Sequence, residues 1–101
     1  MHWIEIIHVR AFSQATKQKA LRLARELSLS RVTDTLSAVT FWVRSDLQTD
    51  ISILLRWIED VDRRAYSPLG LQLAEEFTEF GWVTHSVWQD AKSGGTGRMM
   101  V

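Results

Sequence analysis

Two short segments near the middle of the chain carry a large apolar residue at every second position. They run through Val39, Phe41 and Val43, and then through Ile51, Ile53, Leu55 and Trp57. The polar segment 45–50 separates them. Alternation with a period of two is typical of a strand with one buried face, so the pattern predicts a β-hairpin. We expect a register in which Val43 pairs with Ile53, Phe41 with Leu55 and Val39 with Trp57.

The opposite face of this hairpin is mixed in character. It carries Thr40, Trp42, Arg44, Ser52, Leu54 and Arg56. Such a face is more apolar than one that only meets water and more polar than an ordinary core. We therefore expect a ligand or a second protein molecule to cover it.

The rest of the chain supplies one strand and one helix on each side of the hairpin. Segment 3–12 reads as a strand, and Ser13 is a suitable N-cap for a helix over 14–27 with an apolar stripe through Ala20 and Ala24. Ser67 and Pro68 start a second helix that we expect to end at Gly81, and a last strand follows over 82–90.

The resulting order is strand, helix, strand, strand, helix, strand. This order predicts an α+β protein with the ferredoxin-like βαββαβ fold: a four-stranded antiparallel sheet with two helices on one face. We expect a single domain over 1–91 and a flexible C-terminal tail over 92–101, where glycine and serine are frequent.

Composition excludes several kinds of site and partner. The chain has no cysteine, which rules out disulfides and thiolate chemistry, and its 12 basic and 12 acidic residues balance. The balanced charge gives no electrostatic case for nucleic acid, and no apolar run approaches the roughly 20 residues that span a bilayer. We expect a cytoplasmic protein without nucleic-acid or membrane partners.

Three segments resemble a known family. They are 50–57, which ends in Trp57, then 67–74, where Ser67 and Pro68 open a helix, and 80–88, where a strand follows Gly81. Together they resemble the antibiotic biosynthesis monooxygenase family of the dimeric α+β barrel superfamily. Trp57 is the best single match.

The resemblance implies a homodimer whose two sheets face each other, with a pocket between helices and sheet in each subunit. Some members of that family oxidise aromatic polyketides or quinol-like substrates with oxygen and without metal or flavin, so we expect no cofactor. Similar haem-degrading members bind haem through a histidine on the second helix. This chain has no histidine from 9 to 84, so a haem-degrading role is not expected.

The expected function is therefore that of a cofactor-independent monooxygenase acting on an aromatic or quinol-type small molecule. The alternative is a non-catalytic dimeric protein of the same fold that only binds such a molecule. An RNA-recognition domain shares the order of elements, but strand 51–58 lacks the glycine and surface aromatic residues that such a domain uses.

Three residues are candidates for catalysis. His8 and His85 lie in the first and last strands, which are neighbours in the expected fold, so the two are candidates to approach each other, and a proton shuttle is one interpretation of the pair. The alternatives are a metal site, which lacks a convincing carboxylate, and a pair of structural histidines at an interface or pocket edge. Tyr66 places a hydroxyl near the start of the second helix.

The remaining candidates are aromatic residues and arginines. Phe41, Trp57, Phe77 and Phe80 are expected either to line a pocket for a flat aromatic ligand or to form ordinary core. Trp42, Arg44, Leu54 and Arg56 share the mixed face and are expected at a dimer interface, where Trp and Arg are enriched. Alternatively, Arg44 and Arg56 bind a ligand carboxylate.

Overall fold

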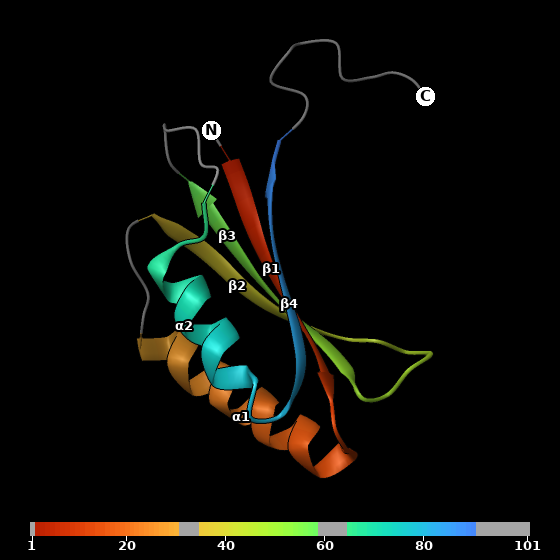
Figure 1. Ribbon diagram of the computed structural model, residues 1–101. Coiled ribbons are helices and arrows are strands. Elements are labelled where there is room, and N and C mark those ends of the chain that lie inside the picture. The colour runs from red at the N-terminus through yellow and green to blue at the C-terminus, as the bar shows by residue number, and fades with distance from the viewer. Residues whose placement is uncertain (1, 31–34, 59–64, 91–101) are drawn as a thin grey trace, which may run out of the picture.

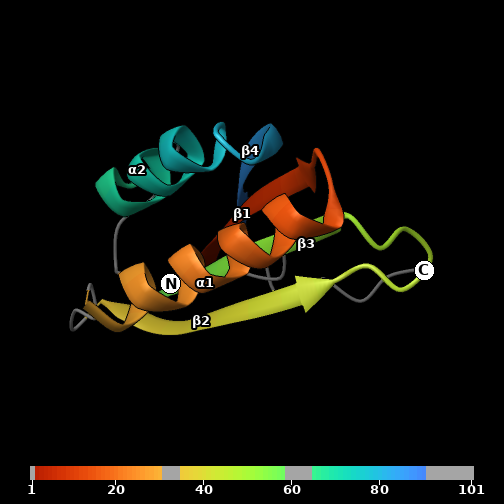
Figure 2. The ribbon, with the colours of Figure 1, turned by 90° about the horizontal axis from the view of Figure 1, so that it is seen from below.

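A computed structural model describes residues 2–30, 35–58 and 65–90 of the chain. Its elements are β1 (His2–Ala11), α1 (Gln14–Ser30), β2 (Leu36–Val43), β3 (Asp50–Ile58), α2 (Pro68–Phe77) and β4 (Gly81–Gln89). The four strands form one antiparallel sheet in the order β2-β3-β1-β4, and both helices pack on the same face of it (Figures 1 and 2). The predicted ferredoxin-like fold is confirmed, and the predicted tail at 92–101 lies outside the described residues.

The core lies between the sheet and the two helices. The central strand β1 contributes Trp3, Ile7 and Val9, all of which are buried. Helix α1 covers β1 and β3 with Ala20, Leu21 and Ala24, and α2 covers β1 and β4 with Leu69, Leu73 and Phe77. The apolar spacing along each helix therefore predicts correctly which side faces the sheet.

The register of the central hairpin differs from the expected one by two residues. Val43 lies opposite Ile51, Phe41 opposite Ile53 and Val39 opposite Leu55. The backbone N–H of Arg44 donates to the carbonyl of Asp50 at 3.1 Å, so the connection lies one residue closer to the N-terminus than the expected register places it. A shift of two keeps every side chain on its face, so the predicted division into two faces holds although the predicted register was wrong.

Helix α2 ends earlier than expected. Its last residue is Phe77, Thr78 is the C-cap, and Gly81 begins β4 instead of ending the helix. A Cβ atom on Gly81 would lie 2.1 Å from the carbonyl oxygen of Arg10 on β1. Glycine is needed here because the two strands approach closely, and not because it terminates the helix.

Neither helix in the described part of the chain is long and apolar enough to cross a membrane. We call the sheet face away from the helices the open face. No helix or strand within the described residues covers it (Figure 2). Three of its tryptophans, Trp42, Trp82 and Trp88, are 60%, 66% and 56% exposed.

Candidate functional site

A buried carboxylate lies at the centre of the helix-facing side of the sheet. Glu5 of β1 sits between Leu55 of β3 and Val87 of β4 and is 0% exposed. Removing a carboxylate from water costs on the order of several kcal/mol unless hydrogen bonds replace the lost hydration. The partners of Glu5 therefore define a site that the fold has to build accurately.

The start of α2 supplies two of these partners. Ser67 is the N-cap of α2, and its backbone N–H donates to Glu5 Oε2 at 3.0 Å. The Ser67 hydroxyl accepts a hydrogen bond from the N–H of Gly70 at 2.9 Å and donates its own proton to Glu5 Oε1. The positive end of the helix thus faces the carboxylate.

Gly70 allows this close approach. A Cβ atom at this position would lie 2.1 Å from Glu5 Oε2 and 2.9 Å from His85 Nε2. Any larger residue would push the first turn of α2 away from the carboxylate. The glycine is therefore part of the site, although it has no functional group.

Two aromatic side chains complete the set around Glu5. The indole nitrogen of Trp57 on β3 donates to Oε1 at 2.9 Å, and Nε2 of His85 on β4 lies 2.9 Å from Oε2. Both side chains occupy positions diagonal to Glu5 on neighbouring strands, from which long side chains reach across. Four donors on two oxygens is the arrangement suited to a carboxylate, which only accepts hydrogen bonds.

This arrangement assigns the tautomer of His85. Because Glu5 accepts, the hydrogen of the neutral imidazole lies on Nε2, and Nδ1 is the proton acceptor. No other described residue forms a hydrogen bond with Nδ1. The side chain of His85 is 9% exposed. A histidine oriented by a buried carboxylate, with one free ring nitrogen, has the geometry of a general base.

Tyr66 lies directly against this histidine. The two rings stack with their centroids 3.8 Å apart and an interplanar angle of 19°, and the Tyr66 hydroxyl donates to the backbone carbonyl of His85 at 3.1 Å. Tyr66 remains 42% exposed. Two of the three predicted catalytic residues are thus brought together, at a point where the site meets solvent.

The predicted substrate-binding aromatics belong to the core or to its edge. Trp57 stacks on Trp3 with ring centroids 5.4 Å apart, and Phe77 is fully buried. Phe41 and Phe80 are half-buried and pack against the same core. Their structural role is clear from this packing, and a role in substrate binding stays a prediction.

His8 does not approach His85, so the interpretation of the two histidines as a proton shuttle is wrong. His8 lies opposite Ser52 and Thr84, whereas His85 lies opposite Ile7, which precedes His8 on β1. Successive residues of a strand point to opposite faces of the sheet, so His8 is on the open face and His85 under the helices. A proton shuttle between the two histidines is therefore excluded in this fold.

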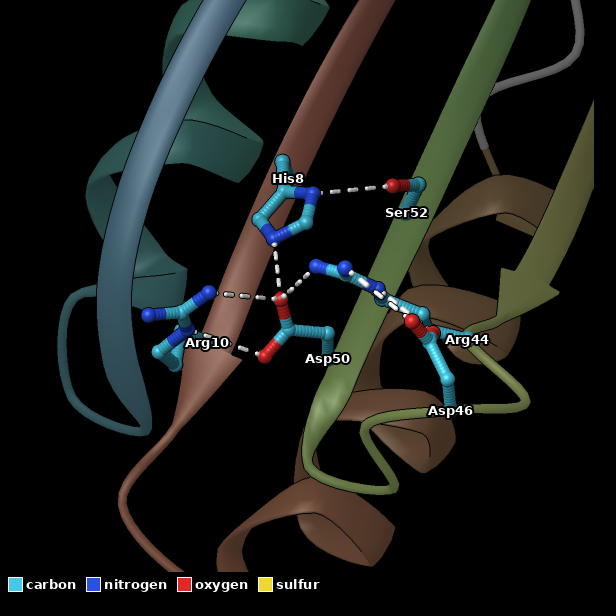
Figure 3. A network of polar contacts seen from close by, with 6 residues as sticks. All are labelled: His8, Arg10, Arg44, Asp46, Asp50 and Ser52. Atoms are coloured by element: carbon cyan, nitrogen blue, oxygen red, sulfur yellow. Dashed lines mark hydrogen bonds and ion pairs between the residues drawn. The ribbon is translucent and has the colours of Figure 1, made fainter.

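His8 belongs to a separate polar network on the open face (Figure 3). Its Nε2 lies 2.9 Å from Oδ2 of Asp50, and its Nδ1 lies 3.3 Å from the hydroxyl of Ser52. Arg10 donates from Nε to Asp50 Oδ1 at 3.1 Å, and Arg44 reaches Oδ2 at 3.6 Å. The network joins β1, β3 and the hairpin connection.

Asp50 is the buried centre of this network and is 0% exposed. Burial by itself raises the pKa of the Asp50 carboxyl, but the hydrogen bonds from Arg10 and His8 and their positive charge outweigh burial and lower the pKa below its ordinary value. Arg44 also binds the exposed Asp46 at 2.7 Å. Arg44, predicted at a dimer interface, is thus already paired within its own chain.

The open face gathers the residues that were predicted to form an interface. Trp42, Leu54 and Arg56 lie on it beside Ile4 and Ile6 of β1, which are half-buried. This common placement confirms the predicted mixed face of the hairpin. Contact with a second copy of the chain stays a prediction.

Sequence reasoning missed Glu5 and Asp50 as functional candidates. Glu5 is the one charged residue among the alternate positions Trp3, Glu5, Ile7 and Val9 of β1. A charge inside a buried alternation is a signal that was available, because such a residue needs partners. Asp50 looked like an ordinary turn residue, and nothing local indicates its burial.

The fold is shared with solved structures of low sequence identity. The chain matches Rv0793 from Mycobacterium tuberculosis with a TM-score of 0.65 and 14% identity, over 89% of this chain and 95% of that one. It matches SnoaB, a cofactor-independent oxygenase from Streptomyces nogalater, with a TM-score of 0.61 and 13% identity, over 91% and 95%. A putative antibiotic biosynthesis monooxygenase from Nitrosomonas europaea gives a TM-score of 0.60 and 11% identity, over 91% and 92%.

These likenesses confirm, at the level of the fold, the resemblance to antibiotic biosynthesis monooxygenases. No protein-family model matches the sequence, and no curated protein matches it either.

Proposed function

We propose that this protein is a cofactor-independent monooxygenase that acts on an aromatic or quinol-type small molecule, with His85 as the general base. The observation that carries the proposal is the Glu5–His85 pair, in which Nε2 is held by a buried carboxylate at 2.9 Å and Nδ1 is free of described partners. The fold shared with an oxygenase that needs no cofactor supports it.

The proposed chemistry starts with removal of a proton from a phenolic hydroxyl by His85 Nδ1. The resulting imidazolium is stabilised by Glu5, which keeps its hydrogen bond to Nε2 throughout. The ring of Tyr66, which stacks on His85 and belongs to a residue that is 42% exposed, offers a surface for an aromatic substrate. Glu5 is a positioning residue, since it acts through His85.

The electrons for oxygen reduction come from the phenolate itself. Molecular oxygen adds at the ring carbon para to the phenolate oxygen. One oxygen atom stays on that carbon as a carbonyl, and the other leaves as water with the hydroxyl and ring hydrogens. A phenol with a free para position thus becomes a quinone with consumption of one oxygen molecule, and no external reductant is needed.

The experiment uses 1-naphthol as a probe and measures oxygen uptake together with incorporation of label from ¹⁸O₂. We expect one labelled oxygen atom per quinone product. The variant His85→Gln keeps an amide donor for Glu5 but has no base, so its rate should fall about 100-fold or more. His2→Gln, at the exposed start of β1, is the matched control and should keep the wild-type rate.

A protein that only binds such molecules is the competing function, and the exposed ring of Tyr66 fits it equally well. In that case wild-type protein binds naphthols, measured by quenching of tryptophan fluorescence, but takes up no oxygen with any phenol or quinol tested. Binding unchanged in His85→Gln, with oxygen uptake lost, supports the enzyme.

The proposal includes a homodimer formed through the open face and expected in the cytoplasm. Two exposed tryptophans of this face already have their indole N–H paired within the chain: Trp42 donates to Thr40 at 3.0 Å and Trp88 to Ser86 at 2.8 Å. Their rings therefore enter an apolar contact without leaving an unpaired donor. Exposed apolar surface of this kind is typical of protein interfaces.

A further inference from the structure

A hollow lies on the open face over β1 and β4, on the opposite side of the sheet from His85. Its volume is about 590 Å³, and it is lined by His8, Arg10, Trp82 and Thr84. Small-molecule sites in proteins commonly measure about 300 to 1,000 Å³. The hollow therefore has the size of a ligand site, and nothing in the chemistry proposed for His85 uses it.

Asp50 holds the arginine of the hollow in place, but only some of the arginine's donors are engaged. Arg10 donates to Asp50 from Nε at 3.1 Å and from Nη2 at 3.3 Å. Its Nη1 amino group has no partner among the described residues, and its side chain is 52% exposed. Asp50 thus holds a guanidinium whose outer donors remain available. His8 offers no donor in addition, because Asp50 and Ser52 occupy both of its ring nitrogens.

Trp82 differs from the other two tryptophans of the open face. Trp42 and Trp88 each donate to a hydroxyl two residues earlier on the same strand. Two residues before Trp82 stands Phe80, which has no hydroxyl, and the Trp82 indole N–H has no partner in the described part of the chain. Phe12 packs edge-on against the Trp82 ring, with centroids 4.8 Å apart, and so steadies it.

Thr84 adds a third polar group to the lining. Its hydroxyl is exposed and forms no hydrogen bond with any described residue. The lining thus offers a guanidinium amino group, an indole N–H and a hydroxyl, while Asp50, the carboxylate that contacts His8 and Arg10, is already occupied by these partners. A hollow rich in donors, with a positive charge and an aromatic wall, complements an anion that carries an aromatic ring.

We propose that this hollow binds a small aromatic carboxylate. The carboxylate accepts hydrogen bonds from Arg10 Nη1, the Trp82 indole N–H and the Thr84 hydroxyl, and the ring packs against the Trp82 indole. This site is independent of the oxygenase chemistry, and it lies on the face assigned above to the homodimer. Ligand binding and association are therefore expected to influence each other.

The test is an NMR titration of the full chain, labelled with ¹⁵N, with benzoate, following the indole N–H signals of the five tryptophans. Trp82→Phe identifies the Trp82 signal by its loss. We expect this signal to shift saturably with benzoate and not with benzyl alcohol, which lacks the charge. Thr84→Val and Arg10→Lys should each weaken binding by about ten- to hundredfold, the range for one hydrogen bond to a charged group. Trp42→Phe, on the same face, should not change it.

An unsaturable shift, an equal response to benzyl alcohol, or unchanged affinity in both Thr84→Val and Arg10→Lys would overturn the proposal. The homodimer and the monooxygenase activity are tested by separate measurements: native mass spectrometry for the dimer and oxygen uptake for the enzyme. A dimer without a benzoate response refutes only the hollow as a site. Saturable benzoate binding by a protein that stays monomeric supports the site and refutes the dimer.

Discussion

A buried carboxylate with four donors tolerates little displacement of any of them, and Gly70 lies against both the carboxylate and one of its donors, His85. Gly70→Ala would place a Cβ atom 2.1 Å from Glu5 Oε2 and 2.9 Å from His85 Nε2. In an unconstrained helix the change would stabilise by up to about 1 kcal/mol. Here we expect a net loss of about 2 kcal/mol in the free energy of unfolding, measured by urea denaturation, because overpacking dominates.

The control for Gly70→Ala is Glu75→Ala, at an exposed position of the same helix. It should change stability by no more than about 0.5 kcal/mol. Equal stability of Gly70→Ala and the wild type would mean that α2 moves away from Glu5 without cost in free energy. The close approach of α2 to Glu5 would then not require glycine at position 70.

Asp50 makes the stability of the protein depend on pH in a defined direction. Its pKa is lowered in the folded state, because hydrogen bonds and charges from Arg10 and His8 outweigh burial. The stabilisation is therefore complete above the ordinary aspartate pKa of about 3.9 and is lost as the pH falls through the lower folded value. Urea midpoints measured from pH 7 to pH 3 should fall at the acidic end.

Asp50→Asn removes the ionised group, so it should be less stable at pH 7 and lose less on acidification. Asp46→Asn is the comparison: that carboxyl also has a lowered pKa through its hydrogen bond with Arg44, but it is exposed. Exposed ion pairs contribute little, so its profile should follow the wild type. Parallel profiles for Asp50→Asn and wild type would contradict the assignment.

Among the helices and strands, the start of α2 has two roles, capping the helix and binding Glu5. A comparison with the start of α1, which is only capped, separates the two contributions to stability. Ser67 caps α2 and also donates to Glu5, whereas Ser13 at the start of α1 accepts from the N–H of Thr16 at 3.1 Å in an exposed setting. Ser13→Ala should cost about 1 kcal/mol, the value of a cap alone. Ser67→Ala should cost about 2 to 4 kcal/mol, since a buried carboxylate also loses a donor.

The two serine variants are compared by thermal or urea unfolding under the same conditions. Equal losses in both variants would show that the contact of Ser67 with Glu5 adds nothing beyond capping. The backbone N–H of Ser67, 3.0 Å from Glu5 Oε2, is unaffected by either change, so the comparison isolates the hydroxyl.

For the whole molecule, the proposed homodimer depends on contact through the open face. Its centre holds Leu54 and Ile6, which lie opposite each other on β3 and β1. Leu54→Glu would place a charge inside the proposed interface, so the variant should be a monomer by light scattering where the wild type is a dimer. Leu71→Glu, at a 51% exposed position on α2, is the matched control and should remain a dimer.

A wild-type monomer at micromolar concentrations would refute the homodimer. The open face would then need a different partner. The rings of Trp42 and Trp88, whose indole N–H groups are hydrogen-bonded within the chain, would pack against that partner instead.

Local patterns in the sequence predict the order of the elements, the buried side of each and the cap of α2. Apolar spacing, proline and capping serines act within a few residues, so Ser67 and Pro68 fix a helix start wherever the helix later packs. The sequence also predicts which residues lie on each face of the hairpin, because a register shift of two residues keeps every side chain on its face.

The contacts between the polar residues follow from the folded arrangement and from no local pattern. Glu5 and Ser67, 62 positions apart, or His8 and Asp50, 42 apart, become neighbours through strand pairing. The face of His8 relative to His85 depends on a register that no local pattern sets, because a shift of one residue reverses every side chain. A buried charge is stabilised by distant donors, so the site around Glu5 exists only once the sheet and α2 have come together.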